Sequence, residues 1–330
     1  MTNAVPNAGN TKTILCVVGP TASGKSALAV RLAQLFDGEV ISCDSMQLYR
    51  GMDIGTAKAT KEETCGVAHH LLDILDIHDP FSVSDYVKRA YECVSDLQKR
   101  GKTPIFCGGT GLYIDSFISG LPFDEYEVKA GLREELSDFA EKNGAEALHA
   151  RLAALDPVCA ASTDPKNVKR VIRALEVCLS TGEPMSVWQK KARDSAKPRD
   201  AVYIGLTFAD RQKLYERIDT RVDAMMKNGL LEETERLIRL GLRETPTAGQ
   251  AIGYKEFYPY FDGTATLEEC VERLKINSRH YAKRQLTWFG RNPNIRFFAV
   301  DTMSKEELYR AATMYFEEAC AKQSERSAEK

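Results

Sequence analysis

In this 330-residue chain, the residues whose types and spacing are best suited to chemistry form a glycine-rich octapeptide. Residues 19–26 read Gly-Pro-Thr-Ala-Ser-Gly-Lys-Ser and lie between an apolar run, 14–18, and a helical pattern that begins at Ala27. In such a P-loop, backbone N–H groups and a helix N-terminus face one anion, Lys25 adds a positive charge, and the Ser26 hydroxyl binds Mg²⁺. The octapeptide therefore predicts a site for a di- or triphosphate.

Two further polar segments follow strand-like runs. Asp44-Ser45-Met46-Gln47 follows the run 39–43, which we expect to neighbour the P-loop strand, and Thr110 follows the run 104–107. Ligands of parallel sheets bind at the carboxyl ends of the strands, so these segments and the P-loop should open onto one crevice. Asp44 could there hold a metal ion or take a proton from a substrate amine or hydroxyl. A plain turn-forming Asp-Ser is the alternative.

Other segments are less specific. The glycines of 51–58 indicate a loop, which is either a lid over the substrate or a connection. His69-His70 lacks the spacing of a metal site, so we expect packing or hydrogen bonds. The nine cysteines form no C-x-x-C pair, so neither disulfides nor a zinc site is indicated, and Cys16, Cys43 and Cys107 lie in apolar runs that predict buried thiols. A switch GTPase is disfavoured, because the run 104–107 does not end in the aspartate that holds Mg²⁺ in such proteins.

The elements that must position these residues indicate an α/β protein. Strand signals alternate with helical ones over the first 120 residues, as expected for a parallel P-loop sheet flanked by helices. Helical patterns then dominate until a strand resumes at Val202–Phe208. We therefore predict a core formed by 13–122 and 201–320, the latter with basic C-terminal helices, an all-helical insertion at 123–200, and a disordered tail at 321–330.

The charge distribution is uneven although the net charge is only −2. The stretch 273–296 holds seven basic residues and no acidic one, and 166–200 holds nine basic against four acidic. Such runs are either solvated helix faces or surfaces for nucleic acid. No window approaches the ~18 apolar residues of a membrane span, and we expect a cytoplasmic protein that contacts no membrane.

Several motifs together are similar to those of one family. They occupy 19–26, 44–49, 51–58, 108–113, 173–176, 251–256 and 282–288. With these motifs the chain resembles bacterial tRNA dimethylallyltransferase over roughly residues 13–300, in the family's order. The resemblance implies transfer of a dimethylallyl group from dimethylallyl diphosphate to N6 of the adenosine 3′-adjacent to the tRNA anticodon, with release of pyrophosphate. It also implies Mg²⁺ as cofactor and the tRNA anticodon stem-loop as partner, and we expect a monomer.

The resemblance also assigns residues. Asp44, Thr110 and Lys25 are the expected catalytic residues, with Asp44 as the base for the adenine amine and Lys25 stabilising charge on the departing pyrophosphate. The expected diphosphate ligands are Gly19, Pro20, Thr21, Ala22, Ser23, Gly24, Lys25, Ser26 and Arg221, with Mg²⁺ on Ser26. The expected tRNA contacts are Asp44, Ser45, Met46, Gln47, Thr110, Arg133, Lys169, Arg170, Arg173, Gln250, Gly253, Lys255, Arg279, Lys283, Arg284 and Gln285.

Three alternatives have distinct signatures. An isopentenyltransferase for free AMP or ATP shares the P-loop but needs neither the helical insertion nor the basic stretch 273–296. A P-loop small-molecule kinase would turn over ATP. A non-catalytic RNA-binding protein would keep both basic stretches and show no turnover, and the position of Asp44 at a strand end argues against it.

Overall fold

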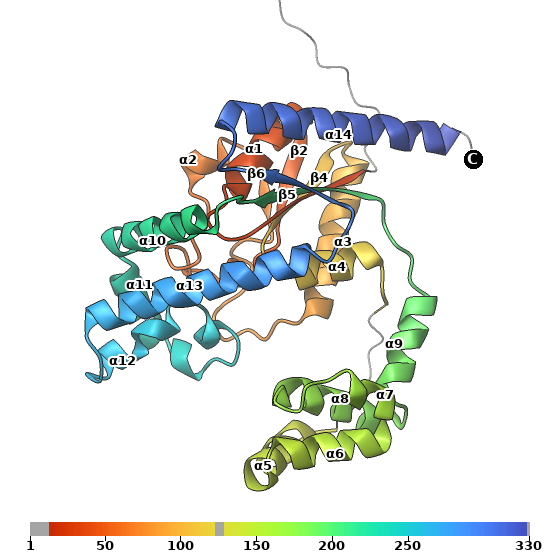
Figure 1. The fold of residues 1–330 in the computed structure, drawn as a ribbon, viewed down its shortest axis with the longest axis vertical. Coiled ribbons are helices and arrows are strands. Elements are labelled where there is room, and N and C mark those ends of the chain that lie inside the picture. Colours follow the sequence, from red (N-terminus) through yellow and green to blue (C-terminus); the bar gives the residue numbers. More distant parts are fainter. Residues whose placement is uncertain (1–12, 123–128, 329–330) are drawn as a thin grey trace, which may run out of the picture. The chain divides into compact units, whose positions relative to one another are not determined.

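Six parallel strands form one sheet in the order β3-β2-β4-β1-β5-β6 (Figure 1). This computed structural model describes residues 13–122 and 129–328. The strands are β1 (Ile14–Val18), β2 (Gly38–Ser42), β3 (His69–His70), β4 (Thr103–Gly108), β5 (Ala201–Thr207) and β6 (Ile295–Ala299). The predicted α/β class with a P-loop sheet is thereby confirmed, although β3 and β6 gave no clear strand signal in the sequence.

The position of β4 differs from the expectation. β4 pairs with β1 on one side and with β2 on the other, so the strand that precedes Asp44 is not adjacent to the P-loop strand. β1 and β4 are both apolar runs buried on two faces, and such runs do not encode which strand lies beside which. The carboxyl ends of β1, β4 and β2 nevertheless lie side by side at one edge of the sheet.

Two apolar layers cover the two faces of the sheet, and the side chains of β1 point alternately into one layer and the other. Ile14, Cys16 and Val18 belong to one buried cluster, and Leu15 and Val17 belong to the other. The second layer is completed by α1 (Lys25–Leu35) and α14 (Lys305–Ala328). The first is completed by α3 (Val83–Lys99), α4 (Gly111–Ser119), α11 (Leu230–Arg239) and α13 (Leu267–Phe289). The remaining elements of this part are α2 (Lys61–Thr64), α10 (Arg211–Lys227), α12 (Tyr258–Phe261) and the 3₁₀ turns η1 (Leu242–Glu244), η2 (Ala248–Gln250) and η3 (Lys255–Phe257).

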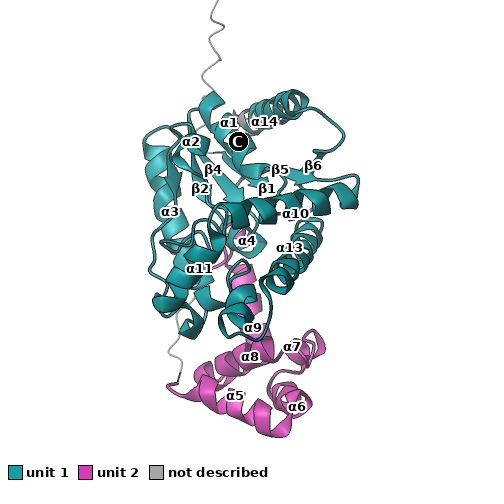
Figure 2. Ribbon diagram, turned by 90° about the vertical axis from the view of Figure 1, so that its left-hand side faces the viewer, with its two compact units in different colours: residues 1–118, 199–330 teal, residues 119–198 magenta. Residues whose placement is uncertain are grey.

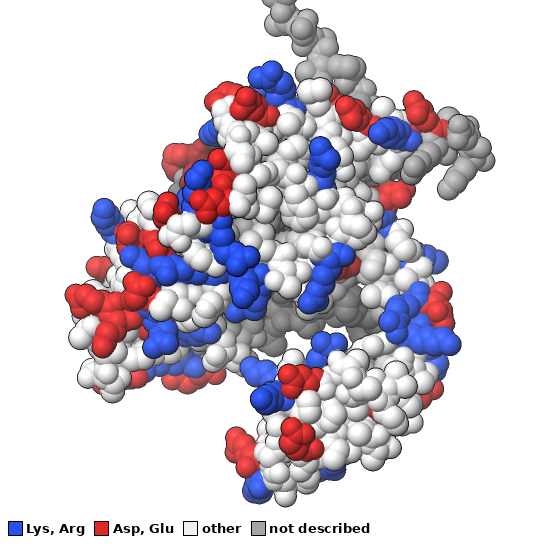
Figure 3. All heavy atoms as spheres, in the orientation of Figure 1, with Lys and Arg blue, Asp and Glu red and all other residues white. Residues whose placement is uncertain are grey.

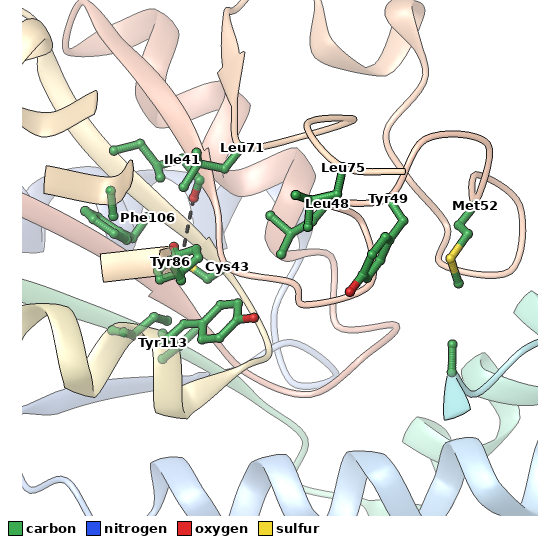
Figure 4. Packing of buried hydrophobic residues seen from close by; sticks show 14 of the residues in the cluster. Ile41, Cys43, Leu48, Tyr49, Met52, Leu71, Leu75, Tyr86, Phe106 and Tyr113 are labelled. Carbon is green, nitrogen blue, oxygen red and sulfur yellow. Dashed lines mark hydrogen bonds between the residues drawn. The ribbon is translucent and has the colours of Figure 1, made fainter. Parts of the chain in front are cut away.

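The first layer anchors the end of β2 (Figure 4). The rings of Tyr86 and Tyr113 stack with their centroids 4.0 Å apart. The Tyr86 hydroxyl donates a hydrogen bond to the carbonyl of Ser42 at 3.0 Å. The backbone that leads into Asp44 is therefore held by a buried aromatic pair.

The polar segment 321–328 differs from its prediction. It was expected to be disordered, but α14 continues through it to Ala328. Gln323 accepts a hydrogen bond from the Thr13 hydroxyl at 2.5 Å, and the segment is rich in residues that favour helices. Among the described residues no helix is long and apolar enough to cross a membrane.

The chain divides into two compact units (Figure 2). One contains the sheet, and the other comprises residues 119–198. The second unit consists of α5 (Leu132–Asn143), α6 (Ala145–Leu155), α7 (Pro157–Ala161), α8 (Val168–Thr181) and α9 (Met185–Asp194). It has its own apolar core, in which Leu136, Leu148, Leu152, Val171 and Leu175 are fully buried. The predicted boundaries were 123 and 200, and residues 123–128 lie outside the described part of the chain.

The chain leaves and returns at neighbouring points. The Arg199 N–H donates to the carbonyl of Ile118 at 2.8 Å, within the unit that contains the sheet. The Lys197 N–H donates to the carbonyl of Gly120 at 3.2 Å, within the helical unit. A Cβ on Gly120 would lie 2.0 Å from the Lys197 carbonyl oxygen, so the two segments approach each other closely.

Candidate active site

The P-loop has the strained backbone that its glycines predict. Gly19 has φ of +142°, and a Cβ there would lie 2.5 Å from the Leu206 carbonyl oxygen. Gly24 has φ of +89° and directly precedes α1. The buried Ser23 hydroxyl has no hydrogen-bond partner in the described part of the chain. The loop therefore curls tightly at the N-terminus of α1, as required for cradling an anion.

Lys25 lies within this loop as a partly buried cation. Its ammonium donates to the Pro20 carbonyl at 2.6 Å. Burial lowers the pKa of Lys25 from 10.5 to about 8, an effect that Cys107 opposes, Arg221 reinforces and Asp44 opposes. A bound anion would favour the protonated form, so this environment is suited to a negatively charged ligand.

The loops after β2 and β4 are joined to each other. The Cys43 N–H donates to the Cys107 carbonyl at 2.8 Å, and the Ser45 N–H donates to the Thr110 hydroxyl at 3.2 Å. Asp44 accepts the Met46 N–H at its Oδ1 atom, at 2.9 Å. None of the described residues donates to Asp44 Oδ2. The structure thus brings Asp44 and Thr110 together, with one carboxylate oxygen left for a substrate.

Gln285 connects this pair of loops to the P-loop. Its Oε1 atom accepts the Thr21 N–H at 2.8 Å, and its Nε2 atom donates to the Gly109 carbonyl at 3.1 Å. The side chain is 4% exposed. The sequence assigned Gln285 to tRNA contact, but the structure places it inside the protein, where it fixes two loops of the site.

Helix α13 also explains the glycines of 108–111. A Cβ on Gly109 would lie 1.8 Å from Gln285 Nε2, and one on Gly111 would lie 2.2 Å from the Trp288 ring. The Trp288 indole donates to Asp115 at 2.7 Å. These glycines are therefore required for the close approach of α13 to the loop that carries Thr110.

A cavity of about 300 Å³ opens beside these loops. Its polar wall includes Thr21, Asp44, Ser45, Met46 and Arg221, and its apolar wall includes Ile218, Val222, Met225 and Leu274. Ile252, Ser278, Tyr281 and Arg284 also line it. The apolar wall was not predicted from the sequence, although positions 218, 222 and 225 recur at helical spacing on one face of α10.

Arg221 and Tyr281 are two partly buried polar groups of this cavity. The Arg221 guanidinium donates to the Thr21 hydroxyl at 3.3 Å. Burial lowers the pKa of Arg221, and Asp44 opposes that shift. Burial raises the pKa of Tyr281, as does the neighbouring Asp44 carboxylate. The cavity therefore has a positively charged group at the P-loop side and a neutral hydroxyl near Asp44.

The loop 51–58 is a fixed connection. Gly55 and Thr56 form part of the cavity wall. The Lys58 ammonium binds the Asp53 carboxylate at 2.6 Å and the Tyr49 carbonyl at 3.0 Å. These contacts favour the second of the two roles expected from its glycines.

The basic residues of α13 separate into paired and unpaired ones. The Arg279 guanidinium binds the Asp219 carboxylate at 2.9 and 2.5 Å, whereas Lys283 is exposed and has no ion-pair partner among the described residues. Arg284 is exposed too, with its guanidinium 5.5 Å from the centroid of the Tyr281 ring. Figure 3 shows Lys and Arg side chains over α10 and α13. Only part of the basic stretch 273–296 is thus free to meet a polyanion.

The predicted segment 250–255 contributes in two ways. Gln250 and Lys255 line the cavity. Gly253 is buried with φ of +109°, and a Cβ there would lie 2.8 Å from the Gly55 carbonyl oxygen. Gly253 therefore supports the cavity through its backbone.

The helical unit shows the same division. Arg133 binds the Glu176 carboxylate at 2.7 and 2.8 Å, and Arg173 lies 3.7 Å from it. Glu176 is 1% exposed. Lys169 and Arg170 are exposed in the first turn of α8 and form no ion pair with a described residue.

Two predictions of ordinary roles are confirmed. His69 contacts the Val67 carbonyl at 2.9 Å and His70 contacts Glu39 at 2.7 Å, so both histidines form hydrogen bonds. None of the nine cysteines, all of which lie in the described ranges, forms a disulfide, and Cys16, Cys43 and Cys107 are buried. In the described ranges no three His, Cys, Asp or Glu residues are grouped as metal ligands would be.

Comparison with known sequences gives the family. The profile of the IPP transferase family matches residues 47–292. A tRNA dimethylallyltransferase of Bacillus subtilis is 50% identical over 290 residues, which are 88% of this chain and 91% of that protein. One from Thermoanaerobacter sp. is 48% identical over 295 residues, 89% of this chain and 94% of that protein. The chain belongs to the IPP transferase family.

Solved structures agree with this assignment. A tRNA isopentenylpyrophosphate transferase from Bacillus halodurans has a TM-score of 0.73 at 42% identity and covers 96% of this chain and 99% of its own. A eukaryotic dimethylallyltransferase acting on tRNA has a TM-score of 0.76 at 29% identity, with 87% of this chain and 74% of its own chain covered.

Proposed function

We propose that this protein transfers a dimethylallyl group from dimethylallyl diphosphate to N6 of the adenosine 3′-adjacent to a tRNA anticodon, and releases pyrophosphate. It is a transferase by family, and its relatives are tRNA dimethylallyltransferases. One observation supports the proposal best: the P-loop, Asp44 and Thr110 meet beside a cavity with one polar and one apolar wall. A diphosphate fits the polar wall and a five-carbon chain fits the apolar one.

The diphosphate would bind to the P-loop, where charge develops as the allylic C–O bond breaks. The P-loop amides, Lys25 and Arg221 would stabilise that charge on the departing pyrophosphate. Lys25 and Arg221 are both held by hydrogen bonds to P-loop atoms in the free protein. Their positions therefore need little reorganisation during the reaction.

Mg²⁺ is the cofactor that we propose. The Ser26 hydroxyl fits it, because it is an exposed hard oxygen ligand in the first turn of α1. The described residues offer no cluster of carboxylates there, which suits an ion that binds through few protein groups and keeps its waters. When bound, Mg²⁺ would neutralise charge on the diphosphate oxygens.

Asp44 would act on the acceptor. The N6 amine of adenine is a poor nucleophile, because its lone pair is delocalised into the ring. Asp44 Oδ2 is available to hold this amine and accept its proton, while Thr110 fixes the Asp44 loop through Ser45. The apolar wall of Ile218, Val222 and Met225 would keep water from the activated carbon.

The acceptor base must leave its stack to reach this cavity, as in other enzymes that modify bases. The unpaired cations of each unit, Lys283 and Arg284 in one and Lys169 and Arg170 in the other, would bind phosphates of the stem-loop. We further propose that the protein acts as a monomer in the cytoplasm, where its tRNA substrate is found.

A direct assay tests the proposal. The protein is incubated with Mg²⁺, dimethylallyl diphosphate and an anticodon stem-loop, and the RNA is weighed by mass spectrometry. We expect a gain of one five-carbon unit, absent when the target adenosine is replaced by another base. Prenylation of free AMP or ATP with no change in the RNA would contradict the proposal, as would RNA-stimulated ATP hydrolysis without prenyl transfer.

A further inference from the structure

Glu233 is a buried carboxylate outside the predicted site. It lies in the first turn of α11 and is 8% exposed. Four donors surround it: the backbone N–H groups of Asp53 at 3.2 Å, Ile54 at 2.9 Å and Gly55 at 3.1 Å, and the Tyr254 hydroxyl at 2.7 Å. The carboxylate thus accepts the hydrogen bonds of three successive backbone amides that would otherwise bind water.

This arrangement fixes the conformation of the loop. Three consecutive N–H groups directed at one anion form a backbone nest, a concavity that an anion stabilises. Burial of the carboxylate is unfavourable unless donors compensate it, so loop and carboxylate require each other. The chain carries its own anion for this nest, 178 residues away from Gly55.

Packing removes the remaining freedom of the loop. A Cβ on Gly55 would lie 2.5 Å from the Tyr254 ring, and one on Gly253 would lie 2.8 Å from the Gly55 carbonyl oxygen. The two glycines allow backbone and ring to approach closely. The loop is therefore held by hydrogen bonds on one side and by contact on the other.

The loop in turn contacts the segment that carries Asp44. The Gln47 side-chain amide donates to the carbonyls of Thr56 at 3.1 Å and Ala57 at 3.4 Å. Gly55 and Thr56 line the same cavity as Asp44 and Ser45. A displacement of the loop would change the cavity wall and remove the partners of Gln47, three residues after Asp44.

We propose that Glu233 is a positioning residue for the transfer reaction. Through the nest of 53–55 it fixes the cavity wall, and through Gln47 it fixes the segment 44–47 that places the acceptor amine. It touches neither substrate nor the reacting atoms. This inference rests on the proposed function. It adds that the reaction requires Glu233, a residue outside the P-loop motif.

The test compares three variants of the full-length protein. Glu233→Gln keeps the size of the side chain but puts an NH₂ group against backbone donors. Tyr254→Phe removes one donor and keeps the ring against Gly55. Glu232→Gln is the matched control, because Glu232 is the exposed neighbour on the same helix. Single-turnover transfer at saturating stem-loop, pyrophosphate affinity and hydrogen exchange of residues 53–55 are measured for each.

We expect the single-turnover rate of Glu233→Gln to fall by about 10- to 100-fold, the loss that a displacement of about 1 Å can cause. Tyr254→Phe should show a smaller fall in the same direction. In both variants the amides of 53–55 should exchange faster, and pyrophosphate affinity should stay within about twofold. The control should match the wild type. A purely structural role would lower the melting temperature without lowering the rate per folded molecule.

A folded Glu233→Gln variant with a rate and exchange equal to the wild type would overturn the inference. If that variant does not fold, Tyr254→Phe decides it by the same two measurements. A wild-type protein that transfers no five-carbon unit to RNA would instead overturn the proposed function. The exchange of 53–55 would then still report whether Glu233 holds the loop.

Discussion

Helices α8 and α13 carry most of the basic residues among the predicted tRNA contacts, and they use their cations differently. In α8 and the adjoining α5, Arg173 and Arg133 face Glu176, which is 1% exposed. In α13 the partners are on the half-exposed surface of α10, where Arg279 binds Asp219. Each helix also has cations without an ion pair among the described residues. A basic run in the sequence is thus a mixture of structural pairs and free charges, and only the free ones release counterions when RNA binds.

The same distinction between groups with and without a partner applies to the carboxylates, and substituting one of them should have the largest effect on the rate. Asp44 has one uncommitted oxygen, whereas Glu176 and Glu233 are fully engaged. Asp44→Ala should lower kcat by about 10²–10⁴, the usual contribution of a positioned base, and leave pyrophosphate binding nearly unchanged. Single-turnover rates check this, and a rate within threefold of wild type would remove Asp44 from the reaction.

Lys25 extends the comparison to a partly buried cation with no carboxylate partner among the described residues. Because desolvation lowers its pKa to about 8, half of the ammonium groups are deprotonated at about that pH in the free protein, and most are above it. A diphosphate binds the protonated form, so pyrophosphate affinity should fall by up to about tenfold per pH unit above 8.

Lys25→Arg is the control for that titration, because the arginine side chain stays charged throughout this pH range. Any change that comes from protonation of pyrophosphate itself is the same for both proteins. Calorimetry from pH 7 to 9.5 compares the two profiles. Parallel profiles would mean that Lys25 does not titrate in this range.

The free cations of α13 should determine salt dependence. Lys283→Ala with Arg284→Ala should weaken stem-loop binding roughly tenfold at low salt. The slope of log affinity against log salt should shrink by up to about 0.9 per lost phosphate contact. Arg279→Ala is the matched variant and should leave the slope almost unchanged, since Asp219 already neutralises it. Equal slopes for both variants would contradict the division into paired and free charges.

The smallest effects are expected in stability. Arg133→Ala leaves the buried Glu176 with Arg173 at 3.7 Å, which should lower the free energy of unfolding by about 1–3 kcal/mol. Arg279→Ala separates a half-exposed pair and should cost only about 0.2–1 kcal/mol. Urea denaturation followed by circular dichroism measures both. The reverse order would show that burial of the partner does not decide the cost.

The sequence predicted which polar loops lie together where this depends on local order. The P-loop, Asp44 and Thr110 each follow a strand, and the rule that ligands bind at strand ends was enough to bring them together. The two helices at 145–155 and 267–289 were equally clear from their periodicity.

Long-range partners were not predictable in this way. Gln285 has the same sequence character as its basic neighbours, and its burial depends on Thr21, 264 residues away. Glu233 looks like an ordinary acidic residue in a helical first turn. The insertion of β4 between β1 and β2 likewise depends on pairing between runs that are equally apolar. Local pattern specifies an element, but contact between distant elements decides the role of each side chain.

The neighbouring exit and return of the chain at Ile118 and Arg199 have an evolutionary consequence. Because the backbone enters and leaves the helical unit at adjacent points, a segment of different length or sequence could replace 119–198 with its ends already in register. Recombination at these two points would exchange the whole unit in a single event. Such an exchange would leave the backbone of the sheet-containing unit, with its P-loop and the loops after β2 and β4, unchanged.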